Sequence, residues 1–130
     1  MIQPILFEHF QPGAVIGETT EVFSPQLADR WHQIFGNAQQ TRAQGASLAV
    51  VMMMRAYLAV VSPRPPGNVH ARQRFTLQRL PEQGESVTTR ITCLSKELRR
   101  ERRYVELEAH GRNASGAPMY RASMTLIWAA

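Results

Sequence analysis

The chain has 130 residues, of which 44% are hydrophobic, and this size suits one compact domain spanning residues 1–130. Its formal net charge of +5 favours anionic partners. The single aspartate, Asp29, excludes sites built on two aspartates, and the single cysteine, Cys93, excludes an internal disulfide and a cysteine-based zinc cluster. We therefore predict no metal site and no bound cofactor.

The first ten residues carry no basic cluster ahead of an apolar run, so they do not resemble a secretory signal, and we expect a cytoplasmic location. Residues 45–61 are nearly continuously apolar, at the short limit for a membrane span, but Arg55 lies among them. A central arginine costs about 2.5 to 3.5 kcal/mol on insertion scales. We predict a buried core helix and no membrane span.

The first predicted elements are a short strand over residues 19–23 and a helix over residues 24–36. Ser24 suits the N-cap of this helix, Pro25 its first turn and Gly36 its end. Its apolar residues fall on one arc, and Asp29 lies opposite that arc. Asp29 should therefore face solvent, where His32 can pair with it.

The long apolar helix should end in the proline-rich loop at residues 62–67. Within this helix, we expect residues 52–54, three methionines, to pack in the core rather than to line a ligand tunnel.

The second half of the chain alternates between apolar and polar residues with a period of two, which is typical of strands with one buried face. Turn-forming residues at 81–84, 96–103 and 113–116 separate the segments. The predicted strands cover residues 69–77, 87–93, 105–109 and 120–128. We predict an antiparallel meander wrapped around the long helix, an α+β arrangement that is the layout of a hotdog fold.

Several segments together resemble the MaoC-like dehydratases, which are hotdog proteins related to (R)-specific enoyl-CoA hydratases. Residues 10–13 and 16–17 are similar to the opening turn of that family, and residues 24–36 to its helix before the active-site loop. Residues 73–76 with 80–85 resemble its strand and turn, and residues 113–116 the turn before its last strand.

The catalytic loop of that family has the form Gly-Asp-x-Asn-Pro-x-His, whereas residues 36–42 here read Gly-Asn-Ala-Gln-Gln-Thr-Arg. Asn37 occupies the position of the catalytic Asp and Arg42 that of the His. An amide cannot accept a proton near neutral pH and a guanidinium stays protonated, so both acid–base groups are missing. The resemblance thus predicts the fold without confident catalytic residues.

The resemblance also suggests where a substrate would bind. Gln44 and Gly45 stand where the family has His-Gly at the start of the central helix, and the backbone N–H of Gly45 could receive a thioester carbonyl. The alternative for Gly45 is a simple helix-start turn. With Asn37 and Phe75, these are the expected substrate-binding residues.

Histidines and glutamates elsewhere in the chain are alternative acid–base groups, but no local sequence motif marks any of them. The four histidines, His9, His32, His70 and His110, have no carboxylate placed beside them by a motif. We expect neighbouring arginines to keep His70 neutral and His110 to lie at a strand end. A hotdog thioesterase would need a carboxylate, and the candidates are Glu18, Glu21 and Glu85.

Residues 99–103 lie in a predicted turn, and four of these five residues are arginines: Arg99, Arg100, Arg102 and Arg103. They could clamp the phosphates of coenzyme A or an acidic carrier protein, or they could form a solvated hairpin end that discourages edge pairing. Nucleic-acid binding is not expected, because Tyr104 is the one aromatic residue beside them.

Three hypotheses follow. The first is a hotdog protein that binds acyl-CoA or acyl-carrier-protein thioesters without hydratase chemistry, as a homodimer or as the non-catalytic subunit of a heteromeric enoyl-CoA hydratase. The second is an acyl-CoA thioesterase with relocated catalytic residues. The third is a basic regulatory or scaffold domain. Whether the chain is an enzyme therefore stays open at this stage.

Overall fold

A computed structural model of the chain describes residues 4–23, 42–80, 82 and 84–129, with side chains within its helix described from Ala49 onward. The elements in chain order are η1 (Phe7–His9), β1 (Val15–Val22), α2 (Arg42–Val60), β2 (Val69–Leu77), β3 (Ser86–Arg99), β4 (Arg102–Asn113) and β5 (Pro118–Trp128). The helix predicted over residues 24–36, with Asp29 and His32, lies outside the described residues.

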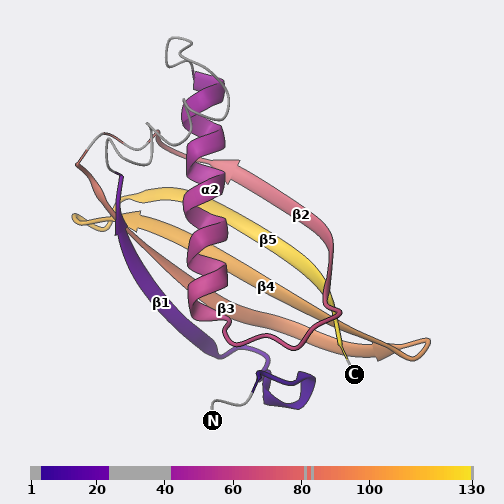
Figure 1. The fold of residues 1–130 in the computed structure, drawn as a ribbon. Coiled ribbons are helices and arrows are strands. Elements are labelled where there is room, and N and C mark those ends of the chain that lie inside the picture. Colours follow the sequence, from indigo (N-terminus) through magenta and orange to yellow (C-terminus); the bar gives the residue numbers. More distant parts are fainter. Residues whose placement is uncertain (1–3, 24–41, 81, 83, 130) are drawn as a thin grey trace.

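The strands form one five-stranded sheet in the order β1-β3-β4-β5-β2, with every neighbouring pair antiparallel. All four strands predicted in the second half are confirmed, but the simple meander is wrong. β3, β4 and β5 do follow one another, whereas β2 pairs with β5 at the far edge. The chain passes from β1 at one edge to β2 at the other, and α2 lies across the sheet between them (Figure 1).

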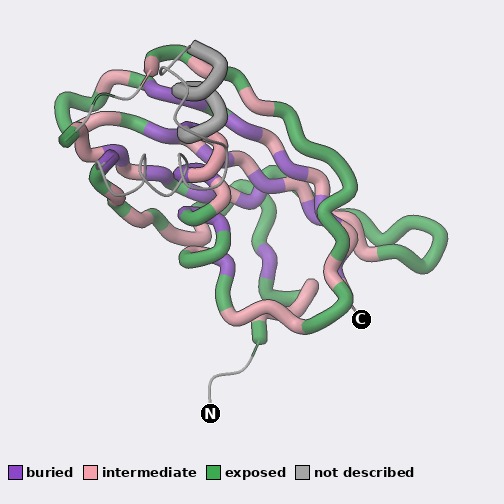
Figure 2. Tube along the Cα trace, turned by 45° about the horizontal axis from the view of Figure 1, so that its top comes forward, coloured by how far each residue is buried: buried purple, intermediate pink, exposed green. Residues whose placement is uncertain are grey.

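The period of two in the strands places alternate side chains on the face covered by α2. Ile91, Leu107 and Met124, from three adjacent strands, are fully buried there. Burying such a side chain contributes roughly 1.5 to 3 kcal/mol. The exposed residues gather along the edge strand β2 and at the β3–β4 hairpin, whereas the middle of the sheet is buried (Figure 2).

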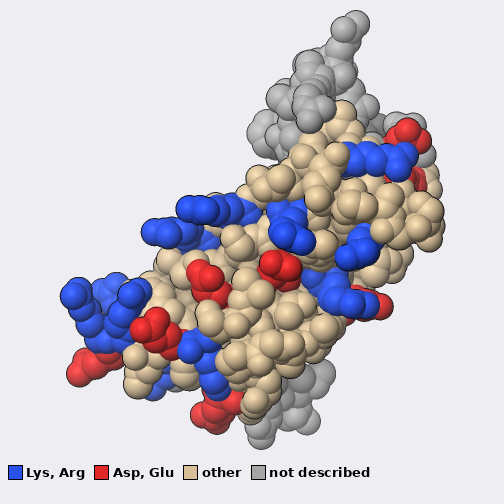
Figure 3. Space-filling view, turned by 180° about the vertical axis from the view of Figure 1, so that it is seen from behind, with Lys and Arg blue, Asp and Glu red and all other residues tan. Residues whose placement is uncertain are grey.

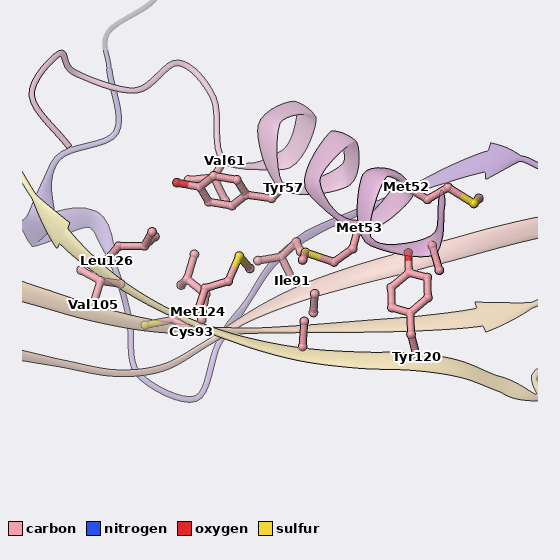
Figure 4. Packing of buried hydrophobic residues seen from close by; sticks show 14 of the residues in the cluster. Met52, Met53, Tyr57, Val61, Ile91, Cys93, Val105, Tyr120, Met124 and Leu126 are labelled. Carbon is pink, nitrogen blue, oxygen red and sulfur yellow. The ribbon is translucent and has the colours of Figure 1, made fainter. Parts of the chain in front are cut away.

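Helix α2 packs on the sheet through residues spaced four apart, which fall on one face of a helix. Ala49, Met53, Tyr57 and Val61 continue this line and are buried, and Figure 4 shows Met53 directed toward Ile91 of the sheet. Met52 and Met53 are buried core residues, as predicted, and Met54 is partly buried against the same core. No helix in the described part of the chain is long and apolar enough to cross a membrane.

The boundaries of α2 differ slightly from the prediction. The helix begins at Arg42, three residues before Gly45. At its other end the Nη1 atom of Arg64 donates to the carbonyl oxygens of Leu58 and Val61, at 3.0 and 2.7 Å. These bonds satisfy carbonyl groups that have no partner within the helix, so the proline-rich loop ends it with its own capping residue.

The segment before β1 contacts the end of β5. Trp128 of β5 donates from Nε1 to the carbonyl oxygen of Ile5 at 2.8 Å, and its ring packs edge-on against Phe10 with 4.9 Å between centroids. Phe10 and Trp128 are both buried, so this contact closes one end of the core.

Candidate functional site

A small cavity of about 60 Å³ lies where β1, α2, β3 and β5 come together. It is lined by Thr19, Thr20, Glu21, Met52, Arg55, Ala56, Val87, Thr89 and Tyr120. Since one water molecule occupies about 30 Å³ in the liquid, this space suits a few waters or a small polar group. Among the described residues it combines one carboxylate with a guanidinium and hydroxyl groups, at the margin of the apolar core, where the Arg55 side chain is 48% exposed and that of Glu21 29%.

Glu21 is the acidic group of this cavity. It lies on β1 next to Thr20, whose side chain bonds to Thr88 on the other face of the sheet. The Nη2 atom of Arg55 is 2.7 Å from the Oε2 atom of Glu21, whereas the Oε1 atom of Glu21 is buried and has no hydrogen-bond partner in the described structure. An unpaired buried acceptor costs roughly 1 to 3 kcal/mol, so Oε1 is a position where a donor would bind favourably.

Tyr120 and Thr89 share a buried hydroxyl–hydroxyl hydrogen bond at the wall of the same cavity. Burial raises the pKa of Tyr120, and the nearby Glu21 charge also raises it, while the bond to Thr89 lowers it. Tyr120 therefore remains a neutral phenol and can act only as a hydrogen-bond donor or acceptor at neutral pH.

Gly111 makes room for Tyr120. The two residues face each other across β4 and β5, and a Cβ atom at Gly111 would lie 2.6 Å from Cε2 of the Tyr120 ring. Phe75, an expected substrate-binding residue, is partly buried on β2, and its ring centroid is 5.4 Å from that of Tyr120. Phe75 thus supports the cavity wall from behind without lining the cavity.

The other expected substrate-binding residues lie at the start of α2 or before it. Asn37 is outside the described residues, as are the side chains of Arg42 and Gln44. Gly45 lies in the first turn of α2, ten residues before Arg55, which corresponds to about 15 Å along the helix axis. The cavity at Glu21 is therefore separate from the position expected for a thioester carbonyl.

The four arginines proposed as a phosphate clamp lie at a hairpin end, as expected, and the turn is tighter than predicted. Arg99 pairs with Arg102 in the sheet, so the turn consists of Arg100 and Glu101 alone. The Arg99 guanidinium lies 4.9 Å from the centroid of the Tyr104 ring. Arg99 comes ten residues after Thr89 on β3, which corresponds to about 33 Å of extended strand, so the structure does not bring these arginines to the cavity.

The described histidines stand apart from the cavity. His70 lies 6.3 Å from the Tyr57 ring, and burial lowers its pKa. The neutral form was expected, but the predicted cause, the neighbouring arginines, is wrong. His110 lies within β4 rather than at a strand end, and its Nε2 atom accepts a hydrogen bond of 2.8 Å from Arg121. The Nδ1 atom of His9 accepts from the backbone N–H of Leu6 at 2.9 Å.

Two of the three candidate carboxylates serve elsewhere. Glu18 pairs with Arg90 on the outer face of the sheet at 3.1 Å. Glu85 accepts from the side chain of Asn113 and from the backbone of Glu82, both at 3.1 Å. Glu21 is the one that lines the cavity. In the described ranges no three histidine, cysteine or acidic side chains come close enough to hold a metal ion.

Sequence comparison finds no matching family model and no matching curated protein. Solved structures do match. The R-hydratase PhaJ1 from Pseudomonas aeruginosa has a TM-score of 0.76 and 15% identity over 96% of this chain and 86% of its own. A MaoC-like dehydratase from Rhodospirillum rubrum has a TM-score of 0.76 and 12% identity, covering 97% of this chain and 98% of its own.

The 3R-hydroxyacyl-ACP dehydratase complex HadBC from Mycobacterium tuberculosis also matches. Its TM-score is 0.68 at 14% identity, covering 89% of this chain and 96% of the matched chain. Identities this low establish the fold alone. The chain therefore has the hotdog fold of MaoC-like dehydratases and (R)-hydratases, as the resemblance in its sequence predicted.

Proposed function

We propose that this chain is a hotdog protein that binds acyl-CoA or acyl-carrier-protein thioesters and has no hydratase chemistry of its own. One observation carries the proposal: the single carboxylate that lines the inner cavity, Glu21, is held by Arg55, and none of the described histidines lines that cavity. Asn37 and Arg42 stand where the family has its catalytic Asp and His. An acid–base pair is therefore supplied neither by these two positions nor by the Glu21 cavity.

Thioester binding is inferred from the fold and from the matched proteins, which include an R-hydratase and a hydroxyacyl-ACP dehydratase. We place the thioester near Gly45 at the start of α2, with Gln44, Asn37 and Phe75 around the acyl group. The described core is filled by Met52, Met53 and Tyr120. A short acyl group therefore suits the site better than a long one.

We infer that the chain works in the cytoplasm beside a second hotdog subunit, either a copy of itself or a catalytic relative. HadBC, a 3R-hydroxyacyl-ACP dehydratase that shares the fold, is a complex. Strand β2 supports the inference because it is an edge strand whose residues are mostly exposed. A second chain could add its own strand there and cover the open backbone groups.

The test is hydration of a short trans-2-enoyl-CoA by the purified protein, alongside titration of a non-hydrolysable acyl-CoA analogue. We expect binding without hydration. The double variant Asn37→Asp/Arg42→His should gain measurable hydration, because it restores both acid–base groups. Hydration by the unaltered protein well above background would overturn the proposal, and so would the absence of analogue binding.

The unpaired Oε1 atom of Glu21 favours a second candidate function, thioester hydrolysis, in which the thioester carbonyl would lie at the Glu21 cavity instead of near Gly45. Glu21 would take a proton from a water molecule, whose oxygen attacks the thioester carbonyl carbon; the C–S bond breaks and the leaving thiolate takes the proton. Release of free thiol from acyl-CoA that is lost in Glu21→Gln but retained in Glu18→Gln would support it. Equal rates in both variants would exclude it.

A further inference from the structure

A second pocket lies on the outer face of the sheet, the face away from α2. Its volume is about 380 Å³, and its walls come from β1, β3 and β4. The lining residues are Glu18, Thr88, Arg90, His110 and Arg112. Figure 3 views the molecule from this side, where basic side chains gather around a few acidic ones.

Two contacts fix the polar groups of this pocket. The Nε atom of Arg121 on β5 donates to Nε2 of His110 at 2.8 Å. Since Nε2 is an acceptor there, the proton of the neutral imidazole is on Nδ1, which remains available as a donor. The Nε atom of Arg90 lies 3.1 Å from the Oε2 atom of Glu18, with both side chains about half exposed.

The charges around His110 are mainly positive. Its pKa is lowered first by burial and then by Arg121, with smaller contributions from Arg112 and Arg90 in the same direction. Glu108, two residues earlier on β4, opposes them. Three guanidinium groups therefore surround this histidine, and the acidic groups near them are Glu18 and Glu108.

We propose that this outer pocket binds the phosphate groups of a small phosphate ester or polyphosphate. Arg90 and Arg112 would pair with the phosphate oxygens, and the Nδ1 atom of His110 would donate a third hydrogen bond, with Arg121 holding the imidazole in place. The volume of the pocket is in the range of small-molecule sites. Glu18 competes with the ligand for Arg90.

This site is independent of the proposed thioester site. It lies on the opposite face of the sheet from α2, so a thioester bound at the start of α2 would not contact it. Loss of anion binding and loss of acyl-CoA analogue binding are therefore separate outcomes.

The test is calorimetric titration of pyrophosphate at low ionic strength, with the His110 ring protons followed by NMR. We expect Arg112→Gln to weaken binding about tenfold, because one charge-assisted contact is lost. Arg72→Gln on β2, at the opposite edge of the sheet from β1, makes the same change in net charge and should weaken binding less than about twofold. Glu18→Gln should tighten binding severalfold, because it frees Arg90.

The source of the phosphate is distinguished by comparing pyrophosphate, ADP and vesicles of phosphatidylglycerol. Tighter binding of ADP supports a nucleotide ligand, and tighter binding of pyrophosphate supports free polyphosphate. The proposal is overturned if vesicles bind and neither small anion does, or if none binds. Equal weakening by Arg112→Gln and Arg72→Gln would also overturn it, because binding would then follow net charge alone.

Discussion

The two faces of the sheet are built from the same strands and differ at every second residue. Thr89 and Tyr120 point inward and are buried, whereas their chain neighbours Arg90 and Arg121 point outward and are exposed. On the inner face a polar group needs a partner inside the protein, while on the outer face water supplies one. Changes inside should therefore alter stability, and changes outside should mainly alter binding.

The largest loss of stability is expected at Gly111 on the inner face, where the Tyr120 ring leaves no space for a side chain. Gly111→Ala would force a methyl group against the Tyr120 ring, which is fully buried and cannot move without disturbing the core. We expect a loss of about 2 to 3 kcal/mol in the free energy of unfolding, measured by urea denaturation.

The matched control on the outer face is Ser123→Ala on β5, a partly buried position. This change should alter the free energy of unfolding by less than about 0.5 kcal/mol. Equal losses in the two variants would contradict the contrast between the faces.

The next effect concerns the hydroxyl pair on the inner face. Tyr120→Phe leaves the Thr89 hydroxyl buried without its partner. We expect a loss of about 1 to 2 kcal/mol in the free energy of unfolding. Adding Thr89→Val removes the unpaired hydroxyl and should recover part of this loss, and a double-mutant cycle measures the coupling. Strict additivity would show that the bond contributes nothing.

A smaller effect should follow pH. The pKa values of His70 and His110 are both lowered in the folded protein, so the unfolded chain binds more protons as the pH falls below about 6.5. The free energy of unfolding should therefore fall between pH 7 and pH 5, and His70→Gln/His110→Gln should flatten this dependence.

High salt should affect the pKa values of the two histidines differently. His70 is affected by burial alone, whereas arginines contribute at His110. At high salt the His70→Gln variant, which keeps His110, should lose more of its pH dependence than His110→Gln, because the arginine charges are screened. Identical responses to salt would contradict these causes.

The smallest effect is expected at the β3–β4 hairpin, beyond the core. Arg100 and Glu101 have φ angles of 51° and 67°, a left-handed conformation that side chains other than Gly and Asn adopt at a cost. Arg100→Asn/Glu101→Gly should raise the free energy of unfolding by about 1 kcal/mol, measured by urea denaturation. A loss of stability would contradict this account of the turn.

The strands were predictable wherever one face is buried, because burial imposes a period of two. The predicted strand over residues 69–77 matches β2 completely. β3 was predicted to end at Cys93 but continues to Arg99, since its last residues lie beyond the core and pair through backbone bonds. The pairing of β2 with β5 was missed, because periodicity within a strand does not specify its neighbour.

The site was predictable only in part. Glu21 was one of three candidate carboxylates, and no local motif singled it out. The missed signal was Arg55, the one charged residue among residues 45–61, which lies close enough to β1 to pair with a carboxylate there while staying about half exposed. That partner depends on how α2 crosses β1, and neither segment alone specifies this.

The place of β2 in the sheet has a consequence for the order of folding. β2 bonds to β5, the last strand that the structure describes, so its backbone groups on that side stay unpaired until residues 118–128 have been made and have folded. During synthesis, the edge strand β2 is therefore made early, but it can join the sheet only after β5 has been made. Such non-local pairing slows folding and exposes an open strand to other chains, which makes this interval the time of greatest aggregation risk.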